Sequence, residues 1–276
     1  MRIRLDIAYD GTAWAGWQVQ PRDPTVQESV ESALQKIYRR PVRVTGASRT
    51  DSGVHALHQV AHFDTQPGDP DVPPNKVRAA IQPWLPGSIA VLRSSLAPPD
   101  WHAIASVTSK RYRYLVHEAL VPQPMYRRTA FRVRGPLDLD AMREGGEHLL
   151  GRHDFAALQT TGTPRKTTVR TILDVAVAEM PMWPLVAPPA MDGHDPGRLI
   201  AIEVEGDGFL YNMVRTIAGT LLNVGKRKWP PRRVAEIVAS RDRDQAGETA
   251  PAAGLWLVRI HYDGPPSPDA EGDSPR

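Results

Sequence analysis

The chain has 276 residues, of which 41% are apolar and 24% charged, a composition typical of a globular protein with one large domain or two of ordinary size. It contains no cysteine, which excludes disulfides, thiolate metal sites and a cysteine nucleophile, and which favours a reducing cytoplasm. No apolar run approaches the roughly 20 residues needed to cross a bilayer, and Met1–Asp6 alternates apolar and charged residues, so we expect no membrane segment and no signal peptide.

The net charge is only +3, but the sequence pI is about 9.2 and the basic residues are clustered. Such clusters suit a polyanion, of which nucleic acid is the commonest in a cytoplasm, although solvated strand and loop faces would look the same. The clusters are Lys110-Arg111-Arg113, Arg127-Arg128, Arg132/Arg134, Arg165-Lys166 and Lys226-Arg227-Lys228.

The first half of the chain alternates predicted strands and helices. Ile3, Leu5 and Ile7 share one face of a strand that ends at Tyr9-Asp10-Gly11, and Thr25 with Glu28 forms the T-x-x-E pattern that begins a helix. Further elements are expected as strands over 42–45, 54–63 and 89–96 and a helix over 74–84.

The second half repeats this alternation after Pro98-Pro99. The predicted strands cover 111–116, 171–179, 199–205 and 255–262, and the predicted helices begin at Asp138 and cover 210–224 and 231–240. The Pro- and Gly-rich stretch 181–197 reads as a loop whose role the sequence does not indicate. We therefore predict an α+β protein of two similar mixed α/β domains, 1–106 and 107–264, with largely antiparallel sheets beside a basic central cleft and a disordered tail, 265–276.

The segment Gly46-Ala47-Ser48-Arg49-Thr50-Asp51-Ser52-Gly53-Val54-His55-Ala56 is the least ordinary of the sequence. In an extended or turn conformation Arg49 and Asp51 point the same way, and the flanking glycines permit tight backbone geometry. The segment is expected to hold a carboxylate on a loop between two strands, where catalytic groups often lie. An Asx-type turn with a surface ion pair is the structural alternative.

This segment resembles the active-site motif of the TruA family of tRNA pseudouridine synthases. Four other blocks resemble the family in the expected order, so the resemblance covers nearly the whole chain. They are Tyr9-Asp10-Gly11-Thr12 with Gly16-Trp17-Gln18 and Thr25-Val26-Gln27; Lys110-Arg111-Tyr112-Arg113-Tyr114; Phe209-Leu210-Tyr211-Asn212-Met213-Val214-Arg215 with Gly219; and Thr249-Ala250-Pro251-Ala252-Ala253-Gly254-Leu255.

The resemblance implies a role for four residues of the reaction centre. Asp51 is the catalytic nucleophile, Arg49 helps to hold the target nucleotide out of its stack, Tyr112 faces the uracil, and Arg215 is the ion-pair partner of Asp51. Independently, Arg215 lies in an apolar helix and needs an acidic partner, for which Asp51 is one candidate and another carboxylate the alternative. Tyr112 and Tyr114 alternate with Arg111 and Arg113, so we expect one pair to face a core and the other to face solvent, and Tyr112 taken alone is more often a core aromatic.

The expected RNA contacts come from Lys110, Arg111, Arg165, Lys166 and Arg170. The family often has an arginine after the element that reads Trp101-His102-Ala103 here, and this chain has Ile104 instead. One expected contact with a phosphate is therefore in doubt.

The function implied is conversion of uridine to pseudouridine at positions 38, 39 and 40 of the tRNA anticodon stem-loop, by a homodimer that uses no cofactor and no metal. The reaction breaks the N1–C1′ bond, turns the base and joins C5 to C1′, so that nothing is oxidised. Asp51 could attack C1′, attack the base or remove a sugar proton, and each role requires it ionised, which a nearby Arg215 would favour by lowering its pKa. Which tRNAs are accepted cannot be read from the sequence.

The sequence is compatible with two other classes of function. His55, His58 and His62 would share one face of a helix and could bind zinc in a hydrolase, but their neighbours favour a strand, where His55 and His58 face opposite ways. A non-catalytic RNA-binding protein would show the same basic and aromatic residues but would not need the Arg49-x-Asp51 pair with Arg215.

Overall fold

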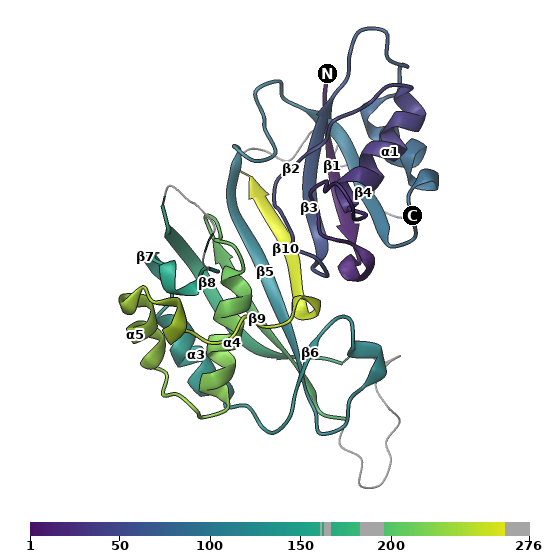
Figure 1. Ribbon diagram of the computed structural model, residues 1–276. Coiled ribbons are helices and arrows are strands. Elements are labelled where there is room, and N and C mark those ends of the chain that lie inside the picture. Colours follow the sequence, from purple (N-terminus) through teal and green to yellow (C-terminus); the bar gives the residue numbers. More distant parts are fainter. Residues whose placement is uncertain (161, 163–166, 183–195, 263–276) are drawn as a thin grey trace. The chain divides into compact units, whose positions relative to one another are not determined.

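The computed structural model describes residues 1–160, 162, 167–182 and 196–262 of the chain (Figure 1). Its contacts divide the chain into two compact units, one of residues 1–108 together with the chain from Leu257 onward, and the other of Ser109–Trp256. The division after Thr108 is close to the boundary expected at 106, whereas the final strand, expected in the second half, belongs mostly to the first unit. The predicted disordered tail, 265–276, and most of the 181–197 loop lie outside the described residues.

The first unit is built on an antiparallel sheet. Its strands are β1 (Arg2–Tyr9), β2 (Thr45–Gly46), β3 (His55–Asp64), β4 (Ile89–Ala97) and β10 (Leu255–Tyr262). The strand order is β4-β1-β3-β10, with β2 paired to β3. In β1, Ile3 lies between Phe63 of β3 and Leu96 of β4, which fixes the register of the three strands.

The helix α1 (Val26–Tyr38) packs on one face of this sheet. Thr25 caps it by accepting a hydrogen bond from the backbone N–H of Glu28 at 3.4 Å, as the T-x-x-E pattern predicts. The Tyr38 ring at its end packs edge-on against Phe63 at 5.4 Å. Leu34 is fully buried, and burial of such a side chain contributes about 2 kcal/mol. The regularly spaced apolar side chains of α1 therefore form the core on which β3 packs.

The predicted helix over 74–84 consists of three consecutive helical pieces. They are η2 (Pro74–Lys76), α2 (Val77–Ile81) and η3 (Gln82–Trp84). Pro83 lacks the N–H that would continue the helical ladder, and the Gln82 side chain instead bonds to the backbone of Ile89 and Val91 at 3.0 and 2.9 Å. The predicted extent of the helix is confirmed, with α-helical geometry over its central part and 3-10 geometry at both ends.

In the second unit the strands follow the order β5-β9-β8-β7 and are largely antiparallel. Its strands are β5 (Val107–Glu118), β6 (Phe131–Val133), β7 (Gly151–Asp154), β8 (Val169–Met180) and β9 (Arg198–Gly206). The short β6 pairs with β5 in parallel, and neither β6 nor β7 was predicted. With the sheet of the first unit, this arrangement confirms the α+β class.

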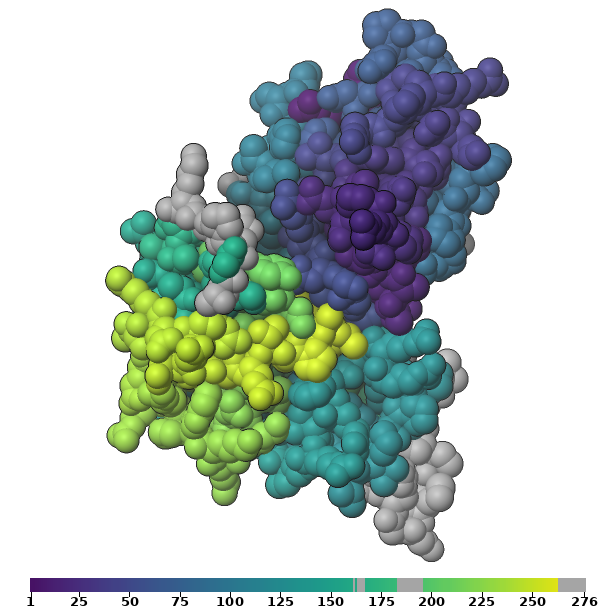
Figure 2. Space-filling view, in the orientation of Figure 1, coloured from purple at the N-terminus to yellow at the C-terminus, as the bar shows by residue number. Residues whose placement is uncertain are grey.

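Three helices accompany this sheet: α3 (Leu139–Glu147), α4 (Met213–Gly225) and α5 (Arg233–Ser240). Asp138 caps α3 by accepting from the N–H of Ala141 at 3.1 Å. The glycines of α3 allow close packing, because Gly145 lies against Leu221 of α4 and Gly146 against Val175 of β8. In Figure 2 the yellow segment that follows α5 lies on the surface of the second unit.

Candidate active site

Asp51 lies on a loop between β2 and β3, which we call the Asp51 loop (residues 47–54). The loop leaves the sheet through a backbone bond from Ala47 N–H to Val60 O at 2.8 Å. The fully buried Gln59 side chain then bonds both backbone groups of Ser48, accepting from its N–H at 3.2 Å and donating to its carbonyl at 2.6 Å. The amide of Gln59 thus replaces a strand partner and fixes where the loop departs.

The amino-terminal block holds the middle of the Asp51 loop. Trp17 N–H donates to Thr50 O at 3.0 Å, and Gly53 N–H donates to Trp14 O at 3.2 Å. The hydroxyls of Tyr9 and Thr50 are buried and lie 2.8 Å apart. The residue before Asp51 is therefore fixed through both its backbone and its side chain.

Two glycines of this block permit the close approach. Gly16 has φ +108°, and a Cβ there would overlap Thr50 O. A Cβ at Gly11 would overlap Val54 O at the other end of the loop. The glycines of the Tyr9–Gly16 block are thus required because two backbone segments touch where a side chain would stand.

Exposure alternates from Ser48 to Asp51, as in an extended segment. Thr50 is buried, whereas Arg49 is exposed and Asp51 is partly exposed. A turn follows, in which Val54 N–H donates to Asp51 O at 3.1 Å. The carboxylate is therefore presented on a backbone fixed from both sides, an arrangement that lowers the cost of orienting it toward a substrate.

In the second unit, Tyr112 lies on β5 with its ring mostly buried at 6% exposure. The Phe209 ring packs edge-on against it at 5.1 Å. Tyr114, two residues on, is fully buried and donates its hydroxyl to Pro251 O at 2.8 Å. Tyr112 and Tyr114 thus face a core, whereas Arg111 and Arg113 are partly exposed on the other face of β5, which confirms the expected alternation.

Arg215 emerges from the first turn of α4. Its Nε donates to Ala250 O at 2.7 Å and its Nη1 to Asn212 Oδ1 at 2.7 Å. Ala250 N–H in turn donates to Arg215 O at 3.2 Å. The carboxy-terminal block Thr249–Leu255 therefore serves to orient this guanidinium, and Gly219 is required there because a Cβ would overlap Glu248 O.

The basic residues expected to contact RNA have different environments. Burial lowers the pKa of Lys110 to about 8. Arg111 forms ion pairs with Asp174, Glu203 and Glu205 at 2.7–2.9 Å, which raise its pKa and neutralise its charge locally. Arg170 donates to the backbone carbonyls of residues 167 and 169. Arg165 and Lys166 lie outside the described residues.

The three histidines of β3 have three separate partners. His55 Nδ1 lies 3.1 Å from both Gly11 N and Asp10 Oδ1, and His58 Nε2 lies 2.9 Å from Asp6 Oδ1. His62 Nδ1 accepts from Ala103 N–H at 3.3 Å. Across the residues that the structure describes, no three His, Asp or Glu side chains are grouped so as to hold a metal ion. Within the same residues, no helix combines the length and apolarity of a bilayer span.

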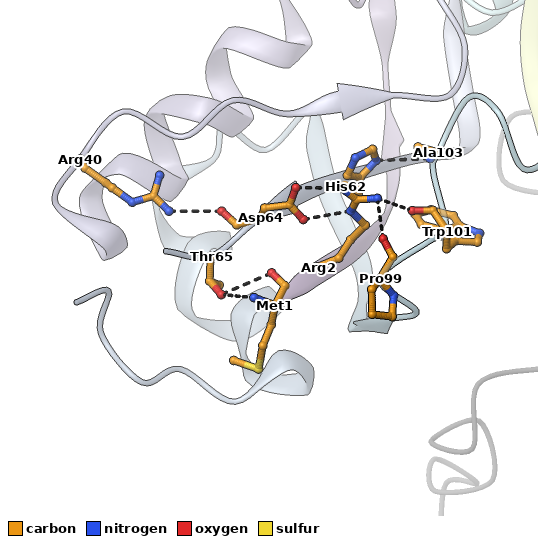
Figure 3. A network of polar contacts seen from close by, with 9 residues as sticks. All are labelled: Met1, Arg2, Arg40, His62, Asp64, Thr65, Pro99, Trp101 and Ala103. Atoms are coloured by element: carbon orange, nitrogen blue, oxygen red, sulfur yellow. Dashed lines mark hydrogen bonds and ion pairs between the residues drawn. The ribbon is translucent and has the colours of Figure 1, made fainter. Parts of the chain in front are cut away.

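His62 belongs to a polar network that anchors the segment before β5 (Figure 3). Arg2 makes two bonds to Asp64 at 2.9 Å and donates to the carbonyls of Pro99 and Trp101. The imidazole of His62 is 5% exposed, and burial lowers its pKa to about 4. Ile104 follows this anchored segment with 54% of its surface exposed, where the family often has an arginine.

The sequence is similar to that of known proteins over most of its length. The sequence profile of a family described as tRNA pseudouridine synthase matches residues 7–104 and 147–263, which is most of the chain.

The chain belongs to this family.

Three relatives, each named tRNA pseudouridine synthase A, match nearly end to end. The relative from Ruminiclostridium cellulolyticum is 43% identical over 95% of this chain and 99% of its own length. Those from Acetivibrio thermocellus and Pelobacter propionicus are 40% and 42% identical over 94% of this chain and 99% of theirs. The resemblance found in the sequence motifs is thereby confirmed.

The predicted site residues are divided between the two units. Asp51 and Arg49 lie in the first unit, and Tyr112, Lys110, Arg111, Arg170 and Arg215 lie in the second. The ion pair of Asp51 with Arg215 and the RNA contacts stay predictions. Sequence reasoning missed Gln59 and Asn212 as supports of Asp51 and Arg215; a glutamine within the apolar run 54–63 was the available signal for the first.

Proposed function

We propose that this protein is an isomerase, a tRNA pseudouridine synthase, which converts uridine to pseudouridine at positions 38, 39 and 40 of the anticodon stem-loop. The supporting observation is the near end-to-end match to relatives named tRNA pseudouridine synthase A. The Asp51 loop adds a physical argument, because its backbone is fixed by two segments, the amino-terminal block and β3, while Asp51 itself remains partly exposed.

The reaction requires two things of the protein, one carboxylate and a pocket that retains the uracil and excludes water. The N1–C1′ bond of uridine breaks, the uracil turns without leaving, and a C5–C1′ bond forms while the hydrogen on C5 is released and N1 gains one. No electron is transferred to or from an external partner, so the reaction requires no redox cofactor. We assign Asp51 as the nucleophile, Arg215 as its ion-pair partner and Tyr112 as the aromatic residue that faces the uracil.

The target base must leave its stack to be reached, at a cost of a few kcal/mol. Contact with an aromatic ring such as that of Tyr112 contributes about 1–3 kcal/mol per base, and contacts with phosphates add to it. We propose Arg49 as the residue that holds the extruded nucleotide, with Lys110 and Arg170 as phosphate contacts. Arg111 is a weaker candidate, because three carboxylates already bind its guanidinium.

The decisive experiment measures tritium release from tRNA that carries uridine labelled at C5. Asp51→Asn keeps the side-chain shape and removes the charge, so we expect turnover to fall by at least about a thousandfold while tRNA binding persists. Asp23→Asn, at an exposed loop position, is the matched control and should release tritium at the wild-type rate. If the wild type binds tRNA and releases no tritium, a non-catalytic RNA-binding role replaces this proposal.

Homodimer formation and a cytoplasmic location are part of the same proposal. Both rest on the family resemblance, and the absence of cysteine supports only the location. Light scattering of the purified chain would give its mass in solution, for which a value of one chain would contradict the dimer.

A further inference from the structure

We propose that Asn212 is a positioning residue for the reaction, which holds the Arg215 guanidinium in the orientation that Asp51 requires. The proposal rests on the function assigned above, in which Arg215 is the partner of the catalytic carboxylate. It goes beyond that function because it gives a role to a side chain outside the reaction centre.

The backbone of Asn212 shows that this position is specialised. It directly precedes α4 with φ 61° and ψ 6°, a left-handed conformation that disfavours most residues with a side chain and that asparagine tolerates better than most. An asparagine before a helix ordinarily accepts a hydrogen bond from the first helical N–H groups. Asn212 makes no such capping bond, so its side chain is used for something other than starting the helix.

The side chain of Asn212 connects Arg215 to a second element. Its Oδ1 accepts from Arg215 Nη1 at 2.7 Å, and its Nδ2 donates to Thr160 Oγ1 at 2.8 Å. A guanidinium can only donate, so the atom that faces it must be the amide oxygen, and the orientation of the amide is settled. Thr160 therefore fixes Asn212, and Asn212 fixes Arg215.

The guanidinium is held on a second edge by Ala250 O, which accepts from its Nε at 2.7 Å. Two bonds from two segments leave a planar guanidinium little rotational freedom. Because a misplacement of about 1 Å in a reacting group can cost about a hundredfold in rate, losing one of these two bonds should slow the chemical step. Substrate binding through the rest of the tRNA should be unaffected.

Thr160 also lines a surface hollow of about 400 Å³ together with Arg243, Asp244, Ala246, Glu248 and Thr249. Water can therefore reach the Thr160 end of the connection and replace a lost hydroxyl in part. The loss of the Thr160 hydroxyl should accordingly have a smaller effect than the loss of the Asn212 side chain, and in the same direction.

The primary test is Asn212→Gly, because glycine adopts the left-handed backbone freely and removes only the side chain. We expect kcat to fall by about 10- to 100-fold with KM for tRNA within about twofold of the wild type. Arg39→Gly is the matched control: Arg39 is exposed, has φ 54° at the end of α1, and lies in the first unit. It should leave both constants unchanged.

Two further arms separate positioning from a general structural role. Thr160→Val should lower kcat by about two- to fivefold, while Thr160→Ser, which keeps the hydroxyl, should restore it. In an Arg215→Lys background, where the Nη1 contact is absent, Asn212→Gly should add less than about twofold.

Wild-type kcat in Asn212→Gly would overturn the proposal, as would a rise in KM without a fall in kcat or full additivity with Arg215→Lys. These outcomes differ from failure of the proposed function, in which the wild type and Asp51→Asn would release tritium equally.

Discussion

At the residue scale, the basic side chains near the proposed site differ in the positive charge that they can present to RNA phosphates. Arg111 and Lys110 are neighbours on β5 and were both predicted to contact RNA. Arg111 is bound by three carboxylates, whereas Lys110 is desolvated with its pKa lowered to about 8. Lys110 therefore carries a charge that changes within an accessible pH range.

This difference predicts a pH-dependent affinity for tRNA. A lysine with its pKa near 8 is charged below that pH and neutral above it, so wild-type affinity should fall by about three- to tenfold between pH 7 and pH 9.5 if Lys110 contacts a phosphate. Lys110→Arg keeps the charge throughout and should flatten the dependence. Filter-binding measurements at constant salt would check this, and an equal decline in both proteins would exclude Lys110 as the source.

At the element scale, the Asp51 loop is shaped by a segment some 35 residues before it in the chain. The amino-terminal block supplies two backbone bonds and the Tyr9 hydroxyl, and Gly16 makes room for Thr50 O. A substitution in either the loop or this block should therefore displace both.

We predict that Gly16→Ala abolishes most activity and destabilises the first unit. The new methyl group would meet the backbone at Thr50 and Asp51, and φ +108° strains any residue with a side chain. The expected cost is about 2–4 kcal/mol in unfolding free energy, with kcat lowered at least about tenfold. Urea unfolding followed by tritium release would measure both.

Gly68→Ala is the matched control for this change. Gly68 also has a positive φ, +88°, but a Cβ there meets nothing within 4 Å. It should cost only about 1 kcal/mol of backbone strain and leave kcat unchanged. Equal effects of the two substitutions would mean that the close approach at Thr50 contributes nothing.

At the scale of the whole molecule, the chain is organised as two units whose boundary does not follow the sequence in order. The chain leaves the first unit at Thr108 and returns to it at Leu257, so that β10 lies beside β3. The segment that leads out of the first unit is anchored by Arg2, Asp64 and His62. The stability of this unit should therefore depend on the charge state of His62.

The pKa of His62 is lowered from 6.5 to about 4, so the folded protein binds fewer protons than the unfolded chain between these values. Its contribution to stability is complete above pH 6.5 and is lost as the pH falls toward 4. We expect the wild type to lose about 2–3 kcal/mol of unfolding free energy from this group across that interval, and His62→Gln to lose correspondingly less. Urea titrations at pH 7, 5.5 and 4.5 would test this, and parallel losses in both proteins would contradict it.

Much of the architecture follows from local rules that the sequence displays. Thr25 and Asp138 start their helices by the capping chemistry that their spacing predicts, and the alternation of Tyr112 and Tyr114 with arginines sets the two faces of β5. The helix over 74–84 was predicted in its extent, but the bonds of the Gln82 side chain to β4 were not, because no local pattern contains them. The parallel strand β6 was missed for the same reason, since its partner lies about 15 residues earlier.

The sequence by itself determined the family, the position of Asp51 and the α+β class, because motifs, capping boxes and apolar periods are properties of neighbouring residues. Only the tertiary structure decided that Gln59 and Tyr9 hold the Asp51 loop, that carboxylates of β8 and β9 neutralise Arg111, and that Asn212 holds Arg215. Most of these contacts join segments far apart in the chain. Their formation depends on which strands pair and in which register, and the burial of the whole core sets that choice.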